Sequence, residues 1–188
     1  MKKALLLTLF CCILATPAGA RNLDQHANES RAAVKEFMGS LKGQLKAALK
    51  EGGPVKALNV CNTSAPAIAM VQSKKHGWKI GRTSLKLRNP DNAPDAWEKA
   101  VLEKFEARKT AGEDPKKIEH YEVVTQDGKQ LFRYMKAIPT AEKPCLACHG
   151  EKIQPKVLET LDKLYPQDQA RGFKAGDIRG AFTITQPM

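Results

Sequence analysis

The stretch EHYEVVTQDGKQLFRYMKAI, residues 119–138, constrains the fold of this chain more than any other feature. Two runs rich in aromatic and β-branched residues, which favour strands, flank the pair Asp127-Gly128. Asp-Gly is a favoured two-residue hairpin turn because both positions accept a positive φ. The pattern predicts an antiparallel β-hairpin, and with it a sheet in which neighbouring strands are joined directly.

The N-terminal third predicts helices. Apolar residues recur at steps of three and four from Leu23 to about Lys50, which indicates one long amphipathic helix. Gly52-Gly53 is expected to end it, and Pro54 is well placed to open the next helix. After an irregular junction at NTSAP, Pro66 restarts a helix that closes at Gly77.

The remaining segments alternate between strands and helices. WKIGRTSLKL, residues 78–87, predicts a strand with a bulge or kink at Gly81. Asp95 and Glu98 place acids in the first turn of a following helix. We expect an exposed charged loop at 108–117 and a short helix at 157–164. DIRGAFTITQ predicts a last strand, with one apolar face that carries Ile178, Phe182 and Ile184.

This order predicts an α+β fold, with a small antiparallel sheet, long N-terminal helices and one domain at residues 21–188. A four-helix bundle is the alternative fold, and the hairpin argues against it.

Residues 1–20 read as a signal peptide. Lys2 and Lys3 precede a short apolar run, and small residues lead to a cleavage point after Ala20. The run is too short to span a membrane comfortably. We expect a periplasmic or otherwise exported protein without stable membrane insertion after cleavage.

The chain is basic. Its formal charge of +11 falls to +9 without Lys2 and Lys3. Export argues against nucleic acid as the partner, so we expect a solvated basic face, or docking to an acidic partner or a membrane surface.

The hairpin runs into KPCLACHG, where Cys145, Cys148 and His149 follow the order C-x-x-C-H. Two thiols at this spacing add across the vinyl groups of a haem, and the adjacent imidazole binds the iron. We predict one covalently attached haem c on the loop after the hairpin, with thioether bonds to Cys145 and Cys148 and with His149 on the iron.

Three other uses of these cysteines are considered. A thioredoxin-type redox pair lacks its βαβ setting. A zinc site with Cys61 would leave a fourth ligand unassigned. A disulfide between Cys145 and Cys148 would leave Cys61 as a free thiol in an oxidising compartment.

The sequence leaves the second axial ligand open. Cys61 is either a small buried hydrophobe or a thiolate ligand. The candidates are Cys61, Met38, Met70, Met135, His26, His76, His120, or none.

Three stretches, ALNVCNTSAPAIA, GRTSLKLRNPDNAPDAWE and YMKAIPTAEKPCLACHG, resemble the PAS-like c-type haem proteins long catalogued as a domain of unknown function. One member is a cyanobacterial cytochrome with His/Cys axial ligation, and the resemblance covers nearly all of residues 21–188. It implies that Cys61 is the thiolate ligand, His149 the proximal histidine, and the fold a PAS-like antiparallel sheet.

Three arginines lie on segments near the expected haem. Arg82, Arg88 and Arg133 are candidates to pair with the haem propionates, since a guanidinium binds a carboxylate bidentately. The alternative for each is a solvated surface arginine.

A thiolate ligand stabilises ferric iron and predicts a low reduction potential. We expect a redox- or gas-responsive haem module, with NO or CO as ligand, or alternatively a low-potential electron carrier that meets a redox partner. An enzyme is not expected, because no distal acid or base stands near Cys61 in the sequence.

Overall fold

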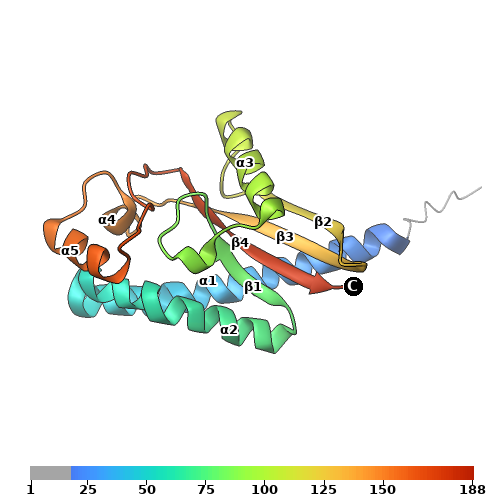
Figure 1. Cartoon of the computed structure of the whole chain (residues 1–188), viewed down its shortest axis with the longest axis horizontal. Coiled ribbons are helices and arrows are strands. Elements are labelled where there is room, and N and C mark those ends of the chain that lie inside the picture. The colour runs from blue at the N-terminus through green and yellow to red at the C-terminus, as the bar shows by residue number, and fades with distance from the viewer. Residues whose placement is uncertain (1–17) are drawn as a thin grey trace, which may run out of the picture.

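The computed structural model describes residues 18–188, and most of the predicted signal peptide lies outside them. The fold is α+β, as predicted, with one antiparallel sheet in the order β1-β4-β3-β2 (Figure 1). The strands are β1 (Lys79–Thr83), β2 (Glu119–Gln126), β3 (Lys129–Pro139) and β4 (Ile178–Pro187). The helices are α1 (Ala18–Asn59), the π-helix η1 (Val60–Ser64), α2 (Ala65–His76), the 3-10 turn η2 (Pro90–Asn92), α3 (Ala96–Thr110), α4 (Leu146–His149) and α5 (Pro155–Leu164).

The predicted hairpin is confirmed. Strands β2 and β3 pair from Glu119↔Lys136 to Gln126↔Lys129. Asp127 and Gly128 take φ values of 51° and 73°, the positive angles that a type I′ turn requires. The hairpin therefore delivers the end of β3 directly to the segment that carries the C-x-x-C-H motif.

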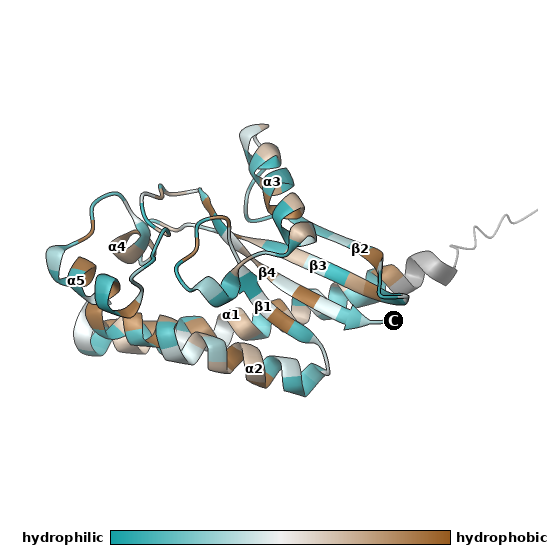
Figure 2. Cartoon of the chain, viewed as in Figure 1, coloured by the Kyte–Doolittle hydropathy of each residue, from teal (hydrophilic) through white to brown (hydrophobic). Residues whose placement is uncertain are grey.

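Helices cover the two faces of the sheet. Helices α1 and α2 lie along one face, and α3 stands on the other (Figure 1). On the first face Phe37 of α1 packs against Phe182 of β4, and on the second Phe105 of α3 lies near Met135 of β3. Figure 2 shows hydrophilic and hydrophobic residues alternating along the strands. The end of the sheet beyond β1, β3 and β4 is left to α4, α5 and their loops.

The break at Gly52-Gly53 is present as a sharp kink within α1, where Gly53 takes a φ of 66°. The predicted junction at NTSAP is wrong, because the chain stays helical through it as a π-helix, Val60–Ser64. Pro66 lacks the N–H that would bond to the carbonyl four residues back. We attribute the widened turn to this missing donor.

Two predicted boundaries shift. Strand β1 ends at Thr83 and pairs regularly through Gly81, so the bulge expected there is absent. The charged segment 108–117 starts as helix, because α3 continues to Thr110. The start of α3 is as predicted, and Asp95 and Glu98 form a reciprocal capping box.

The bulge lies on the neighbouring strand instead. Ile138 pairs with Gly180 and Pro139 with Ile178, so Arg179 is an extra residue without a partner on β3. Across this bulge the side chains change face, which corrects the prediction for the last strand. Ile178 packs on the α3 side, whereas Phe182 and Ile184 pack on the α1 side.

Within residues 18–188, no helix combines the length and the apolar character needed to cross a membrane.

Candidate functional site

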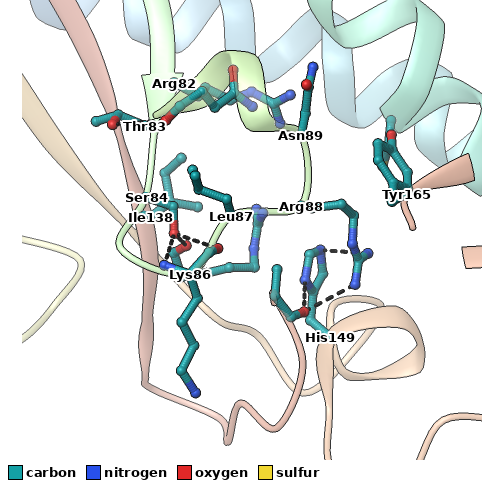
Figure 3. Close-up of a pocket in the computed structure, with 15 residues that line it drawn as sticks. Arg82, Thr83, Ser84, Lys86, Leu87, Arg88, Asn89, Ile138, His149 and Tyr165 are labelled. Carbon is teal, nitrogen blue, oxygen red and sulfur yellow. Dashed lines mark hydrogen bonds between the residues drawn. The ribbon is translucent and has the colours of Figure 1, made fainter. Parts of the chain in front are cut away.

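A pocket lies at the end of the sheet where β1, β3 and β4 meet the C-x-x-C-H segment (Figure 3). It holds about 560 Å³ of space, its open mouth included. Six separate parts of the chain contribute to it: η1, the end of β1 with its following loop, the end of β3, α4, the loop after α5 and the start of β4. The residues used below are Cys61, Arg82, Arg88, His149, Tyr165 and Arg179.

Cys61 reaches the pocket from the π-helical turn. The backbone N–H of Ala65 bonds to the carbonyl of Val60, five residues back, which widens the helix at this point. Isolated π turns of this kind are common at functional sites because they displace one side chain from the regular helical spacing. The widened turn gives Cys61 a position that a regular α-helix would not offer.

The helical segment before Cys61 is anchored to the motif. Leu58 of α1 is buried with Val157 and Leu161 of α5, and Cys148 packs against the same cluster. Packing of α5 against the end of α1 therefore holds the Cys61 turn beside the C-x-x-C-H segment.

His149 has its two ring nitrogens in different environments. Nδ1 lies 2.8 Å from the main-chain oxygen of Ala170, to which it donates in the neutral tautomer. Nε2 faces the pocket, with Arg88 Nη1 at 3.4 Å. Burial, together with Arg179 and Arg88, holds the pKa of His149 well below its ordinary value. His149 is therefore a neutral imidazole with its Nε2 lone pair toward the pocket, the form that binds a metal.

Cys145 and Cys148 lie at the two ends of one turn. The N–H groups of Cys148 and His149 both bond to the carbonyl of Cys145, at 3.2 and 3.0 Å. Both cysteines are free, as is Cys61. Burial raises the pKa of Cys148 to about 11, with nearby Cys61 and Cys145 contributing. Within residues 18–188 no three His, Cys, Asp or Glu side chains cluster to hold a metal ion, so a zinc site built on the three cysteines finds no support.

The methionine candidates for the second axial position lie elsewhere. Met135 is fully buried on the α3 side of the sheet. Met38 packs against the core on the α1 side, and Met70 is 68 % exposed on α2. None of the three lines the pocket.

The histidine candidates are also remote from it. His26 Nδ1 lies 2.6 Å from the Gln186 side chain, and His76 stacks on Trp78 with ring centroids 4.7 Å apart. His120 lies on β2. Cys61 is therefore the one sixth-ligand candidate from the sequence that the structure brings to the pocket with His149.

The three candidate arginines have three different environments. Arg82 lines the pocket, with its guanidinium 5.8 Å from the Phe37 ring. Arg88 also lines it, but is bound to Asp168 at 3.0 Å. The prediction for Arg133 is corrected, because this residue does not line the pocket.

Arg133 belongs to the face of the sheet under α3. Its guanidinium pairs with Asp95 at 2.8 Å and Glu98 at 3.3 Å, and lies 4.2 Å from the centre of the Trp97 ring. These contacts satisfy its charge within the protein. Arg133 is therefore not in position to contact a propionate in the pocket.

Sequence reasoning missed Arg179. It is the bulged residue of β4, and it lines the pocket with a buried Nε that has no hydrogen-bond partner. Burial lowers its pKa, and Arg88 adds to the effect. Its position depends on the register shift between β3 and β4, for which the sequence gives no local signal.

Tyr165 and Asp168 were missed as well. Tyr165 is buried beside the pocket, and burial together with nearby Cys61 raises its pKa to about 12. Asp168 is completely buried under Arg88. Both lie in a loop, YPQDQARGF, whose turn-like composition does not indicate which side chains point inward.

Fold and site together define a class: an α+β domain whose antiparallel sheet ends in a pocket shared by a C-x-x-C-H histidine and a distant cysteine. The chain belongs to the Tll0287-like family, whose model matches residues 19–187. A solved structure, titled the crystal structure of the cyanobacterial haem protein Tll0287, shares the fold. It is 23 % identical, with a TM-score of 0.67 over 87 % of this chain and 96 % of that chain. No protein with a curated description matches the chain.

Proposed function

We propose that this chain is an exported haem c protein with one covalently attached haem, whose axial ligands are His149 and Cys61. The observation that carries the proposal is the pocket itself. His149, whose Nε2 faces the pocket beside Arg88, and a cysteine from a distant π turn line the same space, and His149 directly follows the two cysteines of C-x-x-C-H in the chain. The solved relative is itself described as a haem protein.

The charges of the pocket fit a haem. No carboxylate is among its lining residues, whereas Arg82, Lys86, Arg88 and Arg179 are. Of these, only Arg88 has an ion pair among the residues that the structure describes. Haem carries two propionates, so Arg82 and Arg179 would supply cations for them.

Each residue then has a defined task. Cys145 and Cys148 would each add their S–H across one vinyl group, which needs no oxidant. His149 would bind the iron through Nε2 while Ala170 keeps Nδ1 protonated. Cys61 would bind as the thiolate, since a metal holds a coordinating thiol deprotonated. When bound, the haem supplies a one-electron iron centre able to bind small gases at an open position.

We infer a redox- or gas-responsive role from the Cys61 ligand. A thiolate stabilises ferric iron, so reduction of a bound haem would weaken its hold on Cys61 and would favour protonation or release of this ligand. Release would open a position for NO or CO and free the π turn to move. A catalytic role has less support, because the pocket residues include no carboxylate and no histidine besides His149.

A low-potential electron carrier is the second candidate. The basic charge of the chain favours docking to an acidic redox partner. This role requires that Cys61 stay on the iron in both oxidation states.

One experiment separates these functions. The pyridine haemochrome spectrum of the purified protein should show covalently attached haem, and Cys145→Ala/Cys148→Ala should lose the attachment. The dithionite-reduced protein should then be titrated with CO. Stoichiometric CO binding supports the responsive module, whereas a reduced protein that stays six-coordinate and rejects CO supports the carrier. Absence of bound haem in the wild type would refute both.

A further inference from the structure

The main-chain carbonyl of Ala170 accepts two hydrogen bonds from the pocket. One comes from His149 Nδ1 at 2.8 Å, and the other from Arg88 Nη2 at 3.0 Å. The N–H of the same residue donates to Asp168 Oδ1 at 2.9 Å. The residue whose carbonyl orients the histidine is therefore itself held through both its carbonyl and its N–H.

Asp168 is the centre of this arrangement. Its side chain is 0 % exposed, and its two oxygens accept from Arg88 at 3.0 and 3.1 Å and from Arg171 at 2.8 Å. A bidentate pair of this kind fixes the guanidinium in plane as well as in position. Figure 3 shows the Arg88 guanidinium beside the His149 imidazole.

Arg88 also joins the motif to this loop. Its Nη2 donates to the carbonyl of Cys148 at 2.6 Å, in addition to that of Ala170. The Phe173 N–H bonds to the carbonyl of His149 at 2.9 Å. Residues 148–149, 88 and 168–173 thus form one hydrogen-bonded unit, assembled from three distant parts of the chain.

We propose that Asp168 and Arg88 are positioning residues for His149 and that their paired charges set the potential of a metal on its Nε2. The proposal rests on the proposed function. Metal on Nε2 would replace the 3.4 Å contact from Arg88 Nη1, but the other contacts of Arg88 do not involve that lone pair. A guanidinium would therefore remain beside the iron, with the Asp168 carboxylate behind it.

The two charges act in opposite directions. A positive charge beside the iron disfavours the ferric state and raises the reduction potential, and a negative charge lowers it. Loss of the Asp168 charge leaves Arg88 uncompensated, which predicts an upward shift. Loss of the Arg88 charge predicts a downward shift. A purely structural role gives no such reversal of sign.

The test is spectroelectrochemistry of the haem-loaded protein with Asp168→Asn and Arg88→Gln, and with Asp162→Asn as the matched control. Asp162 pairs with the same Arg171 at 2.6 Å but is exposed and does not contact Arg88. We expect the potential to rise in Asp168→Asn, to fall in Arg88→Gln and to stay at the wild-type value in Asp162→Asn. Shifts of one sign in both pocket variants, or shifts no larger than that of the control, would overturn the proposal.

Arg88→Lys covers the case in which Asp168→Asn does not fold. It keeps the charge but loses the bidentate fork, so its potential should lie above that of Arg88→Gln. We also expect its ferric EPR spectrum to be broader than that of the wild type, because His149 loses its fixed orientation. Equal potentials in Arg88→Lys and Arg88→Gln would count against the proposal. Haem-free wild-type protein would instead point to failure of the proposed function.

Discussion

Arg179 of β4 and Arg82 of β1 line one pocket, and Arg179 depresses the pKa of Arg82, an effect second only to burial. Among residues 18–188 no carboxylate pairs with either guanidinium, and Arg179 Nε is buried without a partner. Buried cations without partners cost stability. We therefore infer that Arg82 and Arg179 bind an anionic group that does not belong to the polypeptide, such as a haem propionate.

The first prediction concerns Arg179→Gln. In the Cys145→Ala/Cys148→Ala background, purified free of haem, this change should raise the free energy of unfolding by roughly 1 kcal/mol, because it removes an unpaired buried charge. In the protein with intact cysteines it should reduce the fraction of chains that carry haem, because one propionate partner is lost. Urea unfolding and the haem-to-protein ratio measure the two effects.

Arg133→Gln is the control for that prediction. Arg133 is paired with Asp95 and Glu98 away from the pocket. Its loss should destabilise the protein by about 3 kcal/mol, since it leaves a buried acid uncompensated. It should not change the haem-to-protein ratio of the folded fraction. In the haem-free background, the free energy of unfolding should therefore rise in Arg179→Gln and fall in Arg133→Gln. Equal destabilisation by the two substitutions would contradict the prediction.

The second prediction concerns Gly180 at the bulge of β4. Its φ is 154°, and a Cβ atom built there would collide with the main-chain oxygen of Thr83 on β1. Gly180→Ala should therefore cost about 2–4 kcal/mol, because the colliding atom is backbone and cannot turn away. The matched control is Gly81→Ala, whose Cβ would meet nothing closer than a Thr183 methyl at 3.8 Å. A Gly180 variant as stable as the Gly81 variant would show that the close approach is absent.

The third prediction is a pH dependence. Burial by itself raises the pKa of Asp168, but hydrogen bonds from Arg88 and Arg171 outweigh it and set the pKa below the ordinary 3.8. A depressed folded-state pKa contributes stability above the unfolded value and loses it as the pH falls through the folded value. Asp168→Asn should therefore destabilise the protein at pH 7 by about 3 kcal/mol. The difference from wild type should shrink below pH 4. A difference that stays constant from pH 7 to pH 3 would show that the ion pair is not its source.

Local signals in the sequence predicted much of the fold. The Asp127-Gly128 turn, the capping box of α3 and the kink at Gly52-Gly53 each depend on a few adjacent residues. Local chemistry therefore sufficed for the α+β class and for the position of the motif after β3.

The site was only partly predictable because it depends on register. Arg133 faces α3, whereas Arg179 faces the pocket. The direction of Arg179 depends on the one extra residue that β4 has opposite β3. The same shift moved Ile178 to the other face of the sheet. The sequence also predicted a break in the helix near Cys61, where the structure has a π turn. A proline can either interrupt a helix or widen it, and the sequence signals are the same in both cases.

The resemblance to the PAS-like c-type haem proteins indicated Cys61 as the second axial ligand, which the residue patterns had left open. By itself the sequence offered seven candidates for the second axial position, and Cys61 could equally have been a buried hydrophobe. The structure adds an independent reason for Cys61, because this residue lines the His149 pocket and the six alternatives do not.

The central claim is that Cys61 and His149 would bind one iron from opposite sides, and EPR of the ferric protein tests it most directly. The wild type should give a low-spin spectrum with the narrow g spread of thiolate ligation. Cys61→Ala should show a high-spin signal instead, while it keeps its covalent haem. The control is Met38→Leu, which should match the wild type, because Met38 packs on the α1 side of the sheet outside the pocket. An unchanged low-spin spectrum in Cys61→Ala would remove Cys61 from the iron and contradict the account.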